Sequence, residues 1–360
     1  MKGRVKGCNQ KIFVMIGLII STISCAQVTD QTMSKEVKAE VIEAVNSLLL
    51  DNYVYPGVAH QMDSVTKAHL ASGRYDSVTI PAQFATLLTE DLYQISKDKH
   101  LRVSYSLADG GGAESGRHGQ QNDFMEDARR GNFGFHEVKV LKGNVGYLDL
   151  RGFFDARIAG KVAHESMGKL IDTDALIIDL RENGGGSPSM IQLISSYLFD
   201  EEPVHLNSFY WRPGDSYSET WTLSDIPGKH RPDWPVYVLT SEETFSAAEE
   251  FSYNLKHLKR ATLIGETTGG GAHPGGIMSA TKGFNVWVPK GRAINPVTGT
   301  NWEGTGVSPH ISVEAVNALQ VACQKVILDL VTDCSDEFTR LEYNGLLKEL
   351  ETNPTALFPD

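Results

Sequence analysis

The chain has little cysteine and no excess of positive charge. Four Cys in 360 residues, with no CxxC pair, exclude a scaffold built on disulfides and give no sign of a zinc site. Lys and Arg number 33 against 45 Asp and Glu, a formal net charge of −12. Because a surface of that sign repels phosphate, nucleic acid and anionic lipid are poor candidate partners. The chain also lacks a visible repeat, a GxxxxGK[ST] loop and a GxGxxG turn, the usual motifs for binding phosphate groups.

What the chain does contain is typical of a folded protein with unusual loops. Hydrophobic residues make up 41% and charged residues 22%, which argues against a largely disordered chain. The length of 360 residues favours two domains. The 34 glycines are clustered in a few segments, and they direct attention to those loops.

The first 26 residues have the features of an export signal. Four cations precede an apolar run over residues 12–23 that is too short to span a membrane comfortably. Two processing routes remain open, since Ser24-Cys25-Ala26 suits signal peptidase and residues 22–25 form a loose lipobox that would leave Cys25 lipidated. We therefore expect a periplasmic, extracellular or lipid-anchored protein. Whether Cys323 and Cys334 pair in that oxidising environment, or stay as thiols, is open at this point.

The remaining chain divides into four regions. Residues 27–107 show apolar residues at helical spacing and predict an N-terminal helical domain. Residues 108–132 are polar and rich in Gly, and predict a flexible loop. Residues 133–320 predict a core domain, and residues 321–360 predict C-terminal helices.

The core domain alternates expected strands with expected helices. Strands are expected over 143–150, 175–180, 236–239 and 262–264, and helices over 161–170, 190–199 and 246–258. The run 175–180 (ALIIDL) is apolar throughout, as in a strand covered on both faces. This alternation predicts the α/β fold class.

Three turns rich in small residues directly follow those strands. In 181–186 (RENGGG), consecutive glycines leave backbone N–H groups free to hold an anion or oxyanion, although such a turn is often only structural. In 240–251, Ser246 stands at a helix N-terminus, where it is either a nucleophile or an N-cap with Glu249 completing a capping box. Ser241 competes for either role. In 265–274, His273 is a candidate cleft residue or an ordinary loop histidine.

These turns, in this order, resemble the tail-specific or C-terminal processing serine peptidase family, and most closely its interphotoreceptor retinoid-binding protein-like branch. The similarity extends over roughly residues 35–320. It rests on the segments ALIIDLRENGGG, TSEETFSAAEEF, LIGETTGGGAHPGG, NPVTGTNWEGTGVSPHISV and SKDKHLRVSYS. The resemblance implies a crotonase-like ββα-spiral catalytic domain with an N-terminal helical bundle, and a cleft between the two.

Two departures from the wider family indicate which catalytic arrangement to expect. Members with a Ser–Lys dyad carry a lysine where this chain has Gly271. Those members also carry a PDZ domain, whereas only about 30 residues separate Val103 from Phe133 here and a domain needs more than that. The chain therefore resembles the tricorn-type arrangement of Ser, His and Glu, without a PDZ domain.

The tricorn-type resemblance implies a role for each candidate residue. Ser246 is the expected nucleophile and His100 the expected general base, while Glu303 would orient the site. Lys99 stands where tricorn-type sites have a serine before the histidine, so a relay through that serine is in doubt. The expected oxyanion donors are the N–H groups of Ala247 and of Gly184 or Gly185. The expected cleft-lining residues are His273, Gly270 and Gly271.

Two functions from different classes follow from this resemblance. The first is an exported serine endopeptidase acting on a peptide or protein substrate, with no metal and no organic cofactor. The second is a non-catalytic binding module for an apolar ligand, like the retinoid-binding relative. The complete set of Ser246, His100, Glu303 and the glycine turn favours the peptidase, because a binding module has no need of it.

Overall fold

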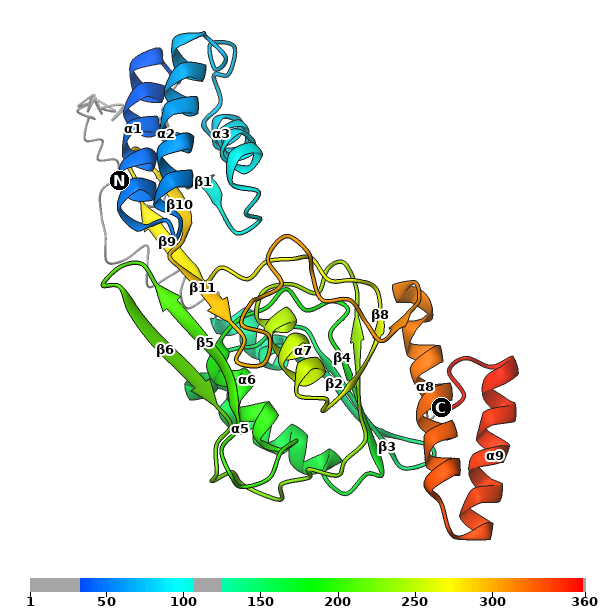
Figure 1. Ribbon diagram of the computed structural model, residues 1–360. Helices are drawn as coiled ribbons and strands as arrows, with labels where there is room; N and C mark the ends of the chain where they lie inside the picture. Colours follow the sequence, from blue (N-terminus) through cyan, green and yellow to red (C-terminus); the bar gives the residue numbers. More distant parts are fainter. Residues whose placement is uncertain (1–32, 107–124, 359–360) are drawn as a thin grey trace, which may run out of the picture.

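The structure is a computed structural model that describes residues 33–106 and 125–358. Three helices form an N-terminal unit: α1 (Lys35–Asn52), α2 (Pro56–Ala71) and α3 (Pro81–Ser96). They pack beside a three-stranded sheet of order β1-β10-β9, made of β1 (Arg102–Tyr105), β9 (Gly275–Ser279) and β10 (Phe284–Pro289) (Figure 1). The helices and this sheet share one apolar core, so the N-terminal unit includes a hairpin that comes from late in the chain.

Local sequence explains where these helices begin and end. Ser34 caps α1, its hydroxyl accepting a hydrogen bond from the Val37 N–H at 3.3 Å. Pro56 and Pro81 occupy the first turns of α2 and α3, where a missing N–H costs nothing. Lys97 ends α3 in the left-handed conformation, with φ of 55°. The chain therefore turns sharply just before the segment that carries His100.

The central sheet has six strands in the order β12-β8-β7-β4-β3-β2. Its members are β2 (Phe135–Leu141), β3 (Val145–Leu150), β4 (Ala175–Asp179), β7 (Val236–Thr240), β8 (Thr262–Gly265) and β12 (Ile311–Ser312). All neighbouring pairs are parallel except β2 and β3. The expected strands over 143–150, 175–180, 236–239 and 262–264 correspond to β3, β4, β7 and β8, so this part of the prediction is confirmed.

Helices cover both faces of the central sheet, which explains why β3, β4 and β7 are buried along their whole length. On one face, Leu176 and Ile178 pack with α5 (Ala156–Leu170), α6 (Pro188–Ser196) and α7 (Ala247–His257). On the other, Ala175 and Ile177 pack with α8 (Ala315–Asp333) and α9 (Glu337–Thr352). Figure 1 shows α8 and α9 side by side at the far end of the molecule from α1–α3.

A second small sheet connects the core to the N-terminal unit. Its strand order is β11-β5-β6, with β5 (His205–Trp211), β6 (Ser216–Trp221) and β11 (Gly291–Ile294). Just after β5, the Arg212 guanidinium donates to the carbonyl oxygens of Leu50, at 2.5 Å, and Tyr53, at 2.6 Å. Because these carbonyls lie at the C-terminal end of α1, a single side chain of the core caps a helix of the other unit.

The observed units differ from the sequential boundaries expected from the sequence. The hairpin β9–β10 falls within the expected core of 133–320 but pairs with β1, and α8 starts at Ala315 rather than at 321. Of the expected loop 108–132, residues 125–130 are helical and most of the rest lies outside the described residues, as does the expected signal segment 1–26. Cys323 and Cys334 are free thiols.

Candidate active site

The three turns singled out in the sequence lie at one edge of the central sheet. They follow β4, β7 and β8, which are adjacent and parallel, so their carboxyl ends meet on the same side. Backbone bonds join the turns, since the Phe245 N–H donates to the Asn183 carbonyl at 3.0 Å and the Gly269 N–H to that of Thr244, also at 3.0 Å. The sheet therefore brings together segments that are far apart in the chain, such as Asn183 and Gly269.

Ser246 has a strained backbone at the start of α7. Its φ of 56° and ψ of −117° are rare for a residue with a side chain and cost free energy that the surroundings must offset. Gly185 makes the turn possible, because a Cβ at that position would lie 2.8 Å from the Ser246 Cβ. This sharp strand-to-helix turn is the geometry of a nucleophile elbow, reached without the GxSxG sequence.

The carboxylate of Glu249 holds this turn and the third turn together. It accepts hydrogen bonds from the N–H groups of Ser246 (2.8 Å), Gly270 (2.6 Å) and Gly271 (2.8 Å), and from the Thr268 hydroxyl (2.5 Å). Burial raises the pKa of Glu249, while these four donors favour its charged form. The capping interaction expected for Glu249 is therefore present, and it extends beyond the helix it caps.

Ser246 and His100 are in hydrogen-bonding contact. The Ser246 Oγ lies 3.0 Å from the His100 Nε2, although the two residues are 146 positions apart. Ser246 belongs to the core, and His100 lies between α3 and β1 in the N-terminal unit. The pair therefore exists only where the two units meet.

Gly271 leaves the space that the His100 ring occupies. A Cβ built on Gly271 would lie 2.7 Å from the His100 Cε1 and would also overlap the Phe245 ring. Any side chain at this position, a lysine included, would therefore displace the histidine. The His100 ring in its present position and a side chain at residue 271 therefore exclude each other.

The second ring nitrogen of His100, Nδ1, faces the carboxylate of Asp98 without a hydrogen bond. His100 Nδ1 is buried and has no partner among the described residues, and the nearest acidic oxygen recorded for it is Asp98 Oδ1, at 3.9 Å. The same Asp98 oxygen accepts from the His100 backbone N–H at 3.0 Å. Asp98 thus fixes the backbone of the histidine and lies on the Nδ1 side of its ring.

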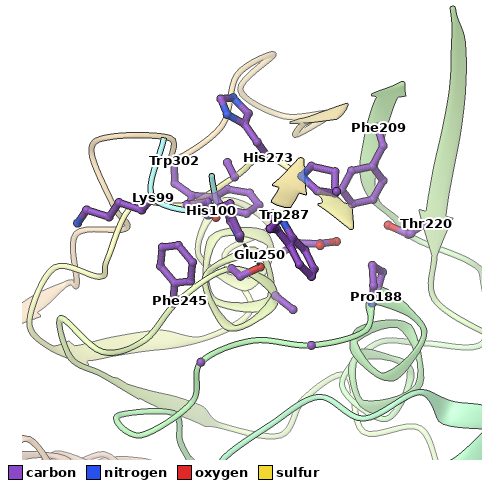
Figure 2. Close-up of a pocket in the computed structure, with 18 of the residues that line it drawn as sticks. Lys99, His100, Pro188, Phe209, Thr220, Phe245, Glu250, His273, Trp287 and Trp302 are labelled. Carbon is purple, nitrogen blue, oxygen red and sulfur yellow. Dashed lines mark hydrogen bonds between the residues drawn. The ribbon is translucent and has the colours of Figure 1, made fainter. Parts of the chain in front are cut away.

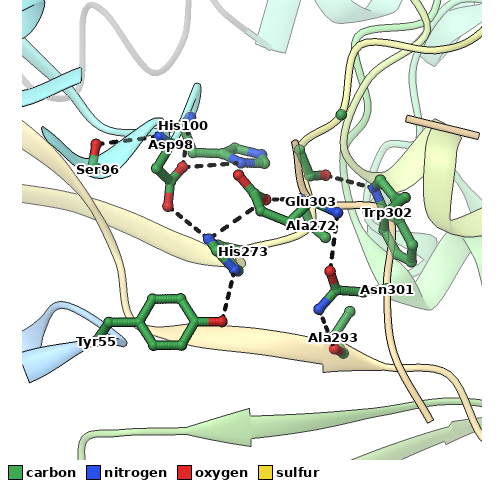
Figure 3. Close-up of polar contacts among 12 residues, drawn as sticks. Tyr55, Ser96, Asp98, His100, Ala272, His273, Ala293, Asn301, Trp302 and Glu303 are labelled. Carbon is green, nitrogen blue, oxygen red and sulfur yellow. Dashed lines mark hydrogen bonds and ion pairs between the residues drawn. The ribbon is translucent and has the colours of Figure 1, made fainter. Parts of the chain in front are cut away.

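Glu303 lies in a polar network with His273, next to Asp98 (Figure 3). Its Oε2 accepts from the Ala272 N–H at 2.5 Å and lies 3.5 Å from His273 Nδ1, while its Oε1 is buried without a partner in the described part of the chain. His273 Nδ1 lies 2.7 Å from Asp98 Oδ2, and His273 Nε2 lies 3.4 Å from the Tyr55 hydroxyl. No hydrogen bond joins Glu303 to His100 within the described residues.

Burial and neighbouring charge shift the pKa values of His100 and Glu303. Burial lowers the pKa of His100 to about 4, with Asp98 acting in the opposite direction. Burial and the Asp98 charge raise the pKa of Glu303. His100 is therefore neutral at ordinary pH, which is the form that can accept a proton from Ser246.

Two backbone N–H groups next to Ser246 are available as oxyanion donors. Neither Gly184 nor Ala247 donates its N–H to another group in the described parts of the chain, and both residues line the cavity beside Ser246. The Gly185 N–H, the third expected donor, is engaged with the Asn183 side-chain oxygen at 2.9 Å. The geometry therefore favours Gly184 and Ala247 over Gly185.

The remaining candidates occupy different positions around this site. Ser241 donates its hydroxyl to the Arg181 carbonyl of the first turn at 2.5 Å, and it is not among the residues that line the cavity beside Ser246. Lys99 donates to the Gly269 carbonyl at 2.6 Å. His273 and Gly271 line the cavity, whereas Gly270, whose N–H binds Glu249, is not among its lining residues.

One group of described side chains has the spacing of metal ligands. The ligand atoms of Asp98, His273 and Glu303 lie within 4.8 Å of one another. Because His273 Nδ1 is already 2.7 Å from Asp98 Oδ2, the same atoms form an internal hydrogen-bond network. Glu303 Oε1 is the one oxygen of these carboxylates that this network leaves without a partner among the described residues.

Sequence reasoning missed two residues that the structure places in the site. Asp98 stands two positions before His100, and the short spacing in KDKH was the signal that could have identified it. Glu250 follows Glu249 in the same helix and lines the cavity, but a second acidic residue in a helix gives no sign of burial.

Comparisons with known proteins agree with the fold and with the order of the motifs. The model of peptidase family S41 matches residues 144–313, and that of the N-terminal domain of peptidase S41 in eukaryotic IRBP matches residues 32–125. The carboxy-terminal processing protease CtpB of Bacillus subtilis is 24% identical over 221 residues, which span 61% of this chain and only 44% of that protease.

Solved structures share the fold at low identity. A peptidase structure from Parabacteroides merdae has a TM-score of 0.52 and 18% identity, covering 77% of this chain and 90% of its own. A lipoprotein from Streptococcus agalactiae has a TM-score of 0.50 and 16% identity, covering 79% and 94%. The α/β, crotonase-like core with its N-terminal helical region is thus confirmed. The chain belongs to the S41 family of serine peptidases and carries the N-terminal domain typical of the IRBP branch.

Proposed function

We propose that this chain is an exported serine endopeptidase that cleaves peptide bonds through an acyl-enzyme on Ser246. The observation that supports it most directly is the 3.0 Å contact between the Ser246 hydroxyl and His100 Nε2. Nucleophile and base within hydrogen-bonding reach are the first geometric requirement of this chemistry.

In the proposed reaction, His100 moves one proton twice. Its neutral Nε2 takes the proton of the Ser246 hydroxyl as Oγ attacks the substrate carbonyl carbon, and then gives that proton to the leaving amine. In the second half, water attacks the resulting ester while His100 takes its proton, and His100 then returns that proton to Ser246 Oγ as the acid product leaves. The N–H groups of Gly184 and Ala247 would stabilise the negative oxygen in both halves.

Asp98 and Glu303 would support the histidine rather than transfer its proton. The positive charge that develops on His100 faces Asp98 at 3.9 Å, and the free oxygen of Glu303 belongs to the same network. A carboxylate near the imidazolium lowers the free energy of the charged pair. We assign both residues a positioning and electrostatic role.

The test of this function is labelling with a Ser-reactive phosphonate, followed by peptide mapping and peptidase assay. We expect Ser246 to carry the label, and Ser246→Ala to abolish both labelling and hydrolysis. Ser241→Ala is the control, because the Ser241 hydroxyl donates to the Arg181 carbonyl of the first turn. A label on Ser241, or hydrolysis that survives in Ser246→Ala, would overturn the assignment.

The cavity beside Ser246 leaves the apolar-ligand module as a second candidate. Its volume is about 600 Å³, and Phe209, Trp211 and Trp287 line it. A binding module of this kind does not require the Ser246–His100 contact or the free N–H groups of the glycine turn. Binding of an apolar ligand by a protein that resists the phosphonate would favour this alternative.

Export is the part of the proposal that depends on the sequence alone. It is supported by the cations and the apolar run within residues 1–23. Mass spectrometry of the protein from its native host should find an N-terminus at Gln27 or at a lipid-modified Cys25. A chain that keeps its first residue would contradict export.

A further inference from the structure

A buried acidic side chain lies in the cavity beside the proposed nucleophile. Glu250 is 4% exposed and lines the same cavity as Ser246 (Figure 2). The two residues are one helical turn apart, and the Glu250 N–H donates to the Ser246 carbonyl at 2.9 Å. Glu250 is therefore placed to contact a substrate side chain that enters the cavity next to the attacked carbonyl.

The carboxyl group of Glu250 is only partly satisfied for a buried acid. Its Oε1 has no hydrogen-bond partner in the described residues, and neither does the amide nitrogen of Asn207 or of Asn254. These two amides lie near the carboxyl group and favour its charged form, but burial is the larger influence and raises its pKa to about 8. An unpaired buried carboxyl destabilises a protein unless a ligand satisfies it.

The walls of the cavity suit a long side chain with a polar end. Phe209 and Trp211 come from β5, and Trp287 comes from β10. Aromatic faces pack against methylene groups and attract a cation. Lys99, a cation that also lines the cavity, extends away from Glu250 in Figure 2 and binds the Gly269 carbonyl.

From this placement we infer that Glu250 is a specificity residue that recognises a lysine or arginine side chain on the residue whose carbonyl Ser246 attacks. The inference rests on the proposed peptidase function and names its substrate class. The cation would form a charge-assisted hydrogen bond with the Glu250 carboxylate, while its methylene groups pack against the aromatic walls.

Other side chains fit this cavity less well. An apolar side chain would leave the carboxyl group buried and unpaired. An acidic side chain would oppose the ionisation of Glu250, whose pKa burial already raises. The net charge of −12 also favours the approach of basic peptides over acidic ones.

The test compares peptides that differ only in this residue. Quenched substrates with Lys, Arg, Gln or Leu before the scissile bond give kcat/KM, and the matching product peptides, which end at that residue, give Kd. We expect the wild type to prefer Lys or Arg over Leu by about 10–100-fold in both measurements. Glu250→Gln, which keeps the side-chain volume, should lose this preference.

A matched control tests the role of Glu250, and an independent readout tests the proposed peptidase function. Glu243→Gln removes the same charge from an exposed position of the preceding turn and should keep the preference. The rate at which the phosphonate labels Ser246 measures the reactivity of the proposed nucleophile, and this measurement does not depend on how a peptide side chain binds. Equal Kd values for the Lys, Arg and Leu products, or a preference unchanged in Glu250→Gln, would overturn the inference even if labelling succeeds. A lack of labelling, with the Kd preference intact, would overturn the peptidase function alone.

Discussion

His100 combines a contact suited to catalysis with an environment that resists charge. Its Nε2 lies 3.0 Å from the Ser246 Oγ, while its Nδ1 is buried without a partner in the described residues. Burial disfavours the imidazolium, and the carboxylate of Asp98 offsets part of that cost. The residue should therefore be a base that stays neutral well below neutral pH.

This environment predicts that kcat/KM is lost only at an unusually low pH. His100 accepts a proton only in its neutral form, so kcat/KM is lost as pH falls through its pKa. That pKa is lowered from 6.5 to about 4, below the range of roughly 6–7.5 expected from an ordinary imidazole. We expect kcat/KM to stay near its plateau at about pH 6 and to fall below about pH 5. The Leu peptide is the substrate for this measurement, because its hydrolysis does not require the Glu250 carboxylate, whose pKa burial raises. A half-maximal value near pH 7 with that peptide would contradict this account.

Gly271 is the second position where a single residue decides the geometry. An alanine Cβ there would lie 2.7 Å from the His100 Cε1 and overlap the Phe245 ring. Gly271→Ala should therefore move the imidazole and lower kcat by about 10–100-fold, since small displacements of a catalytic group are costly.

The control for this substitution is Gly168→Ala. Gly168 lies within α5, and a Cβ there meets no atom within 4 Å. The Gly168→Ala substitution should leave kcat unchanged and stabilise the helix by up to about 1 kcal/mol. If steady-state kinetics find Gly271→Ala equal to the wild type, His100 does not depend on that space.

At the scale of elements, Glu249 joins the start of α7 to the loop after β8. It accepts four hydrogen bonds, and replacement by Gln would turn an amide toward N–H groups. Glu249→Gln should lower the free energy of unfolding by about 1–3 kcal/mol, because buried donors lose their acceptor. Denaturant unfolding measures this change. Glu243→Gln, at an exposed position, should stay within about 0.5 kcal/mol, and equal effects for the two variants would contradict the role given to Glu249.

The sequence predicted elements better than it predicted their assembly. Periodicity indicated the helical N-terminal region, and apolar runs located β3, β4, β7 and β8, because those patterns are local. The pairing of β1 with β10, 180 positions later, leaves no local signal, and it placed a hairpin of the expected core in the N-terminal unit. Ser246 and His100 were found through family resemblance, whereas Asp98 and Glu250 became visible only through contacts and burial.

At the scale of the whole molecule, the site depends on how the two units are held together. Arg212 connects the core to the end of α1 by hydrogen bonds to Leu50 and Tyr53. Because His100 and Ser246 come from different units, weakening this connection should loosen the catalytic pair.

Arg212→Ala should therefore affect both stability and reactivity. We expect the free energy of unfolding to fall by about 1–3 kcal/mol, because helix carbonyls lose a charged donor. We also expect phosphonate labelling of Ser246 to slow several-fold. Arg157→Ala is the control, since that side chain is 88% exposed and pairs only with Asp155 in the described structure. If the Arg212 variant loses stability but labels at the wild-type rate, the connection does not position His100.

The central claim is that His100 activates Ser246, and the labelling rate of His100→Ala measures this most directly. The account predicts that the phosphonate modifies Ser246 in the wild type and that His100→Ala slows this reaction by a factor on the order of 10³. His273→Ala, which removes the neighbouring histidine, should slow it far less. Labelling that is unchanged in His100→Ala but abolished in His273→Ala would contradict the account and assign the base to the core domain.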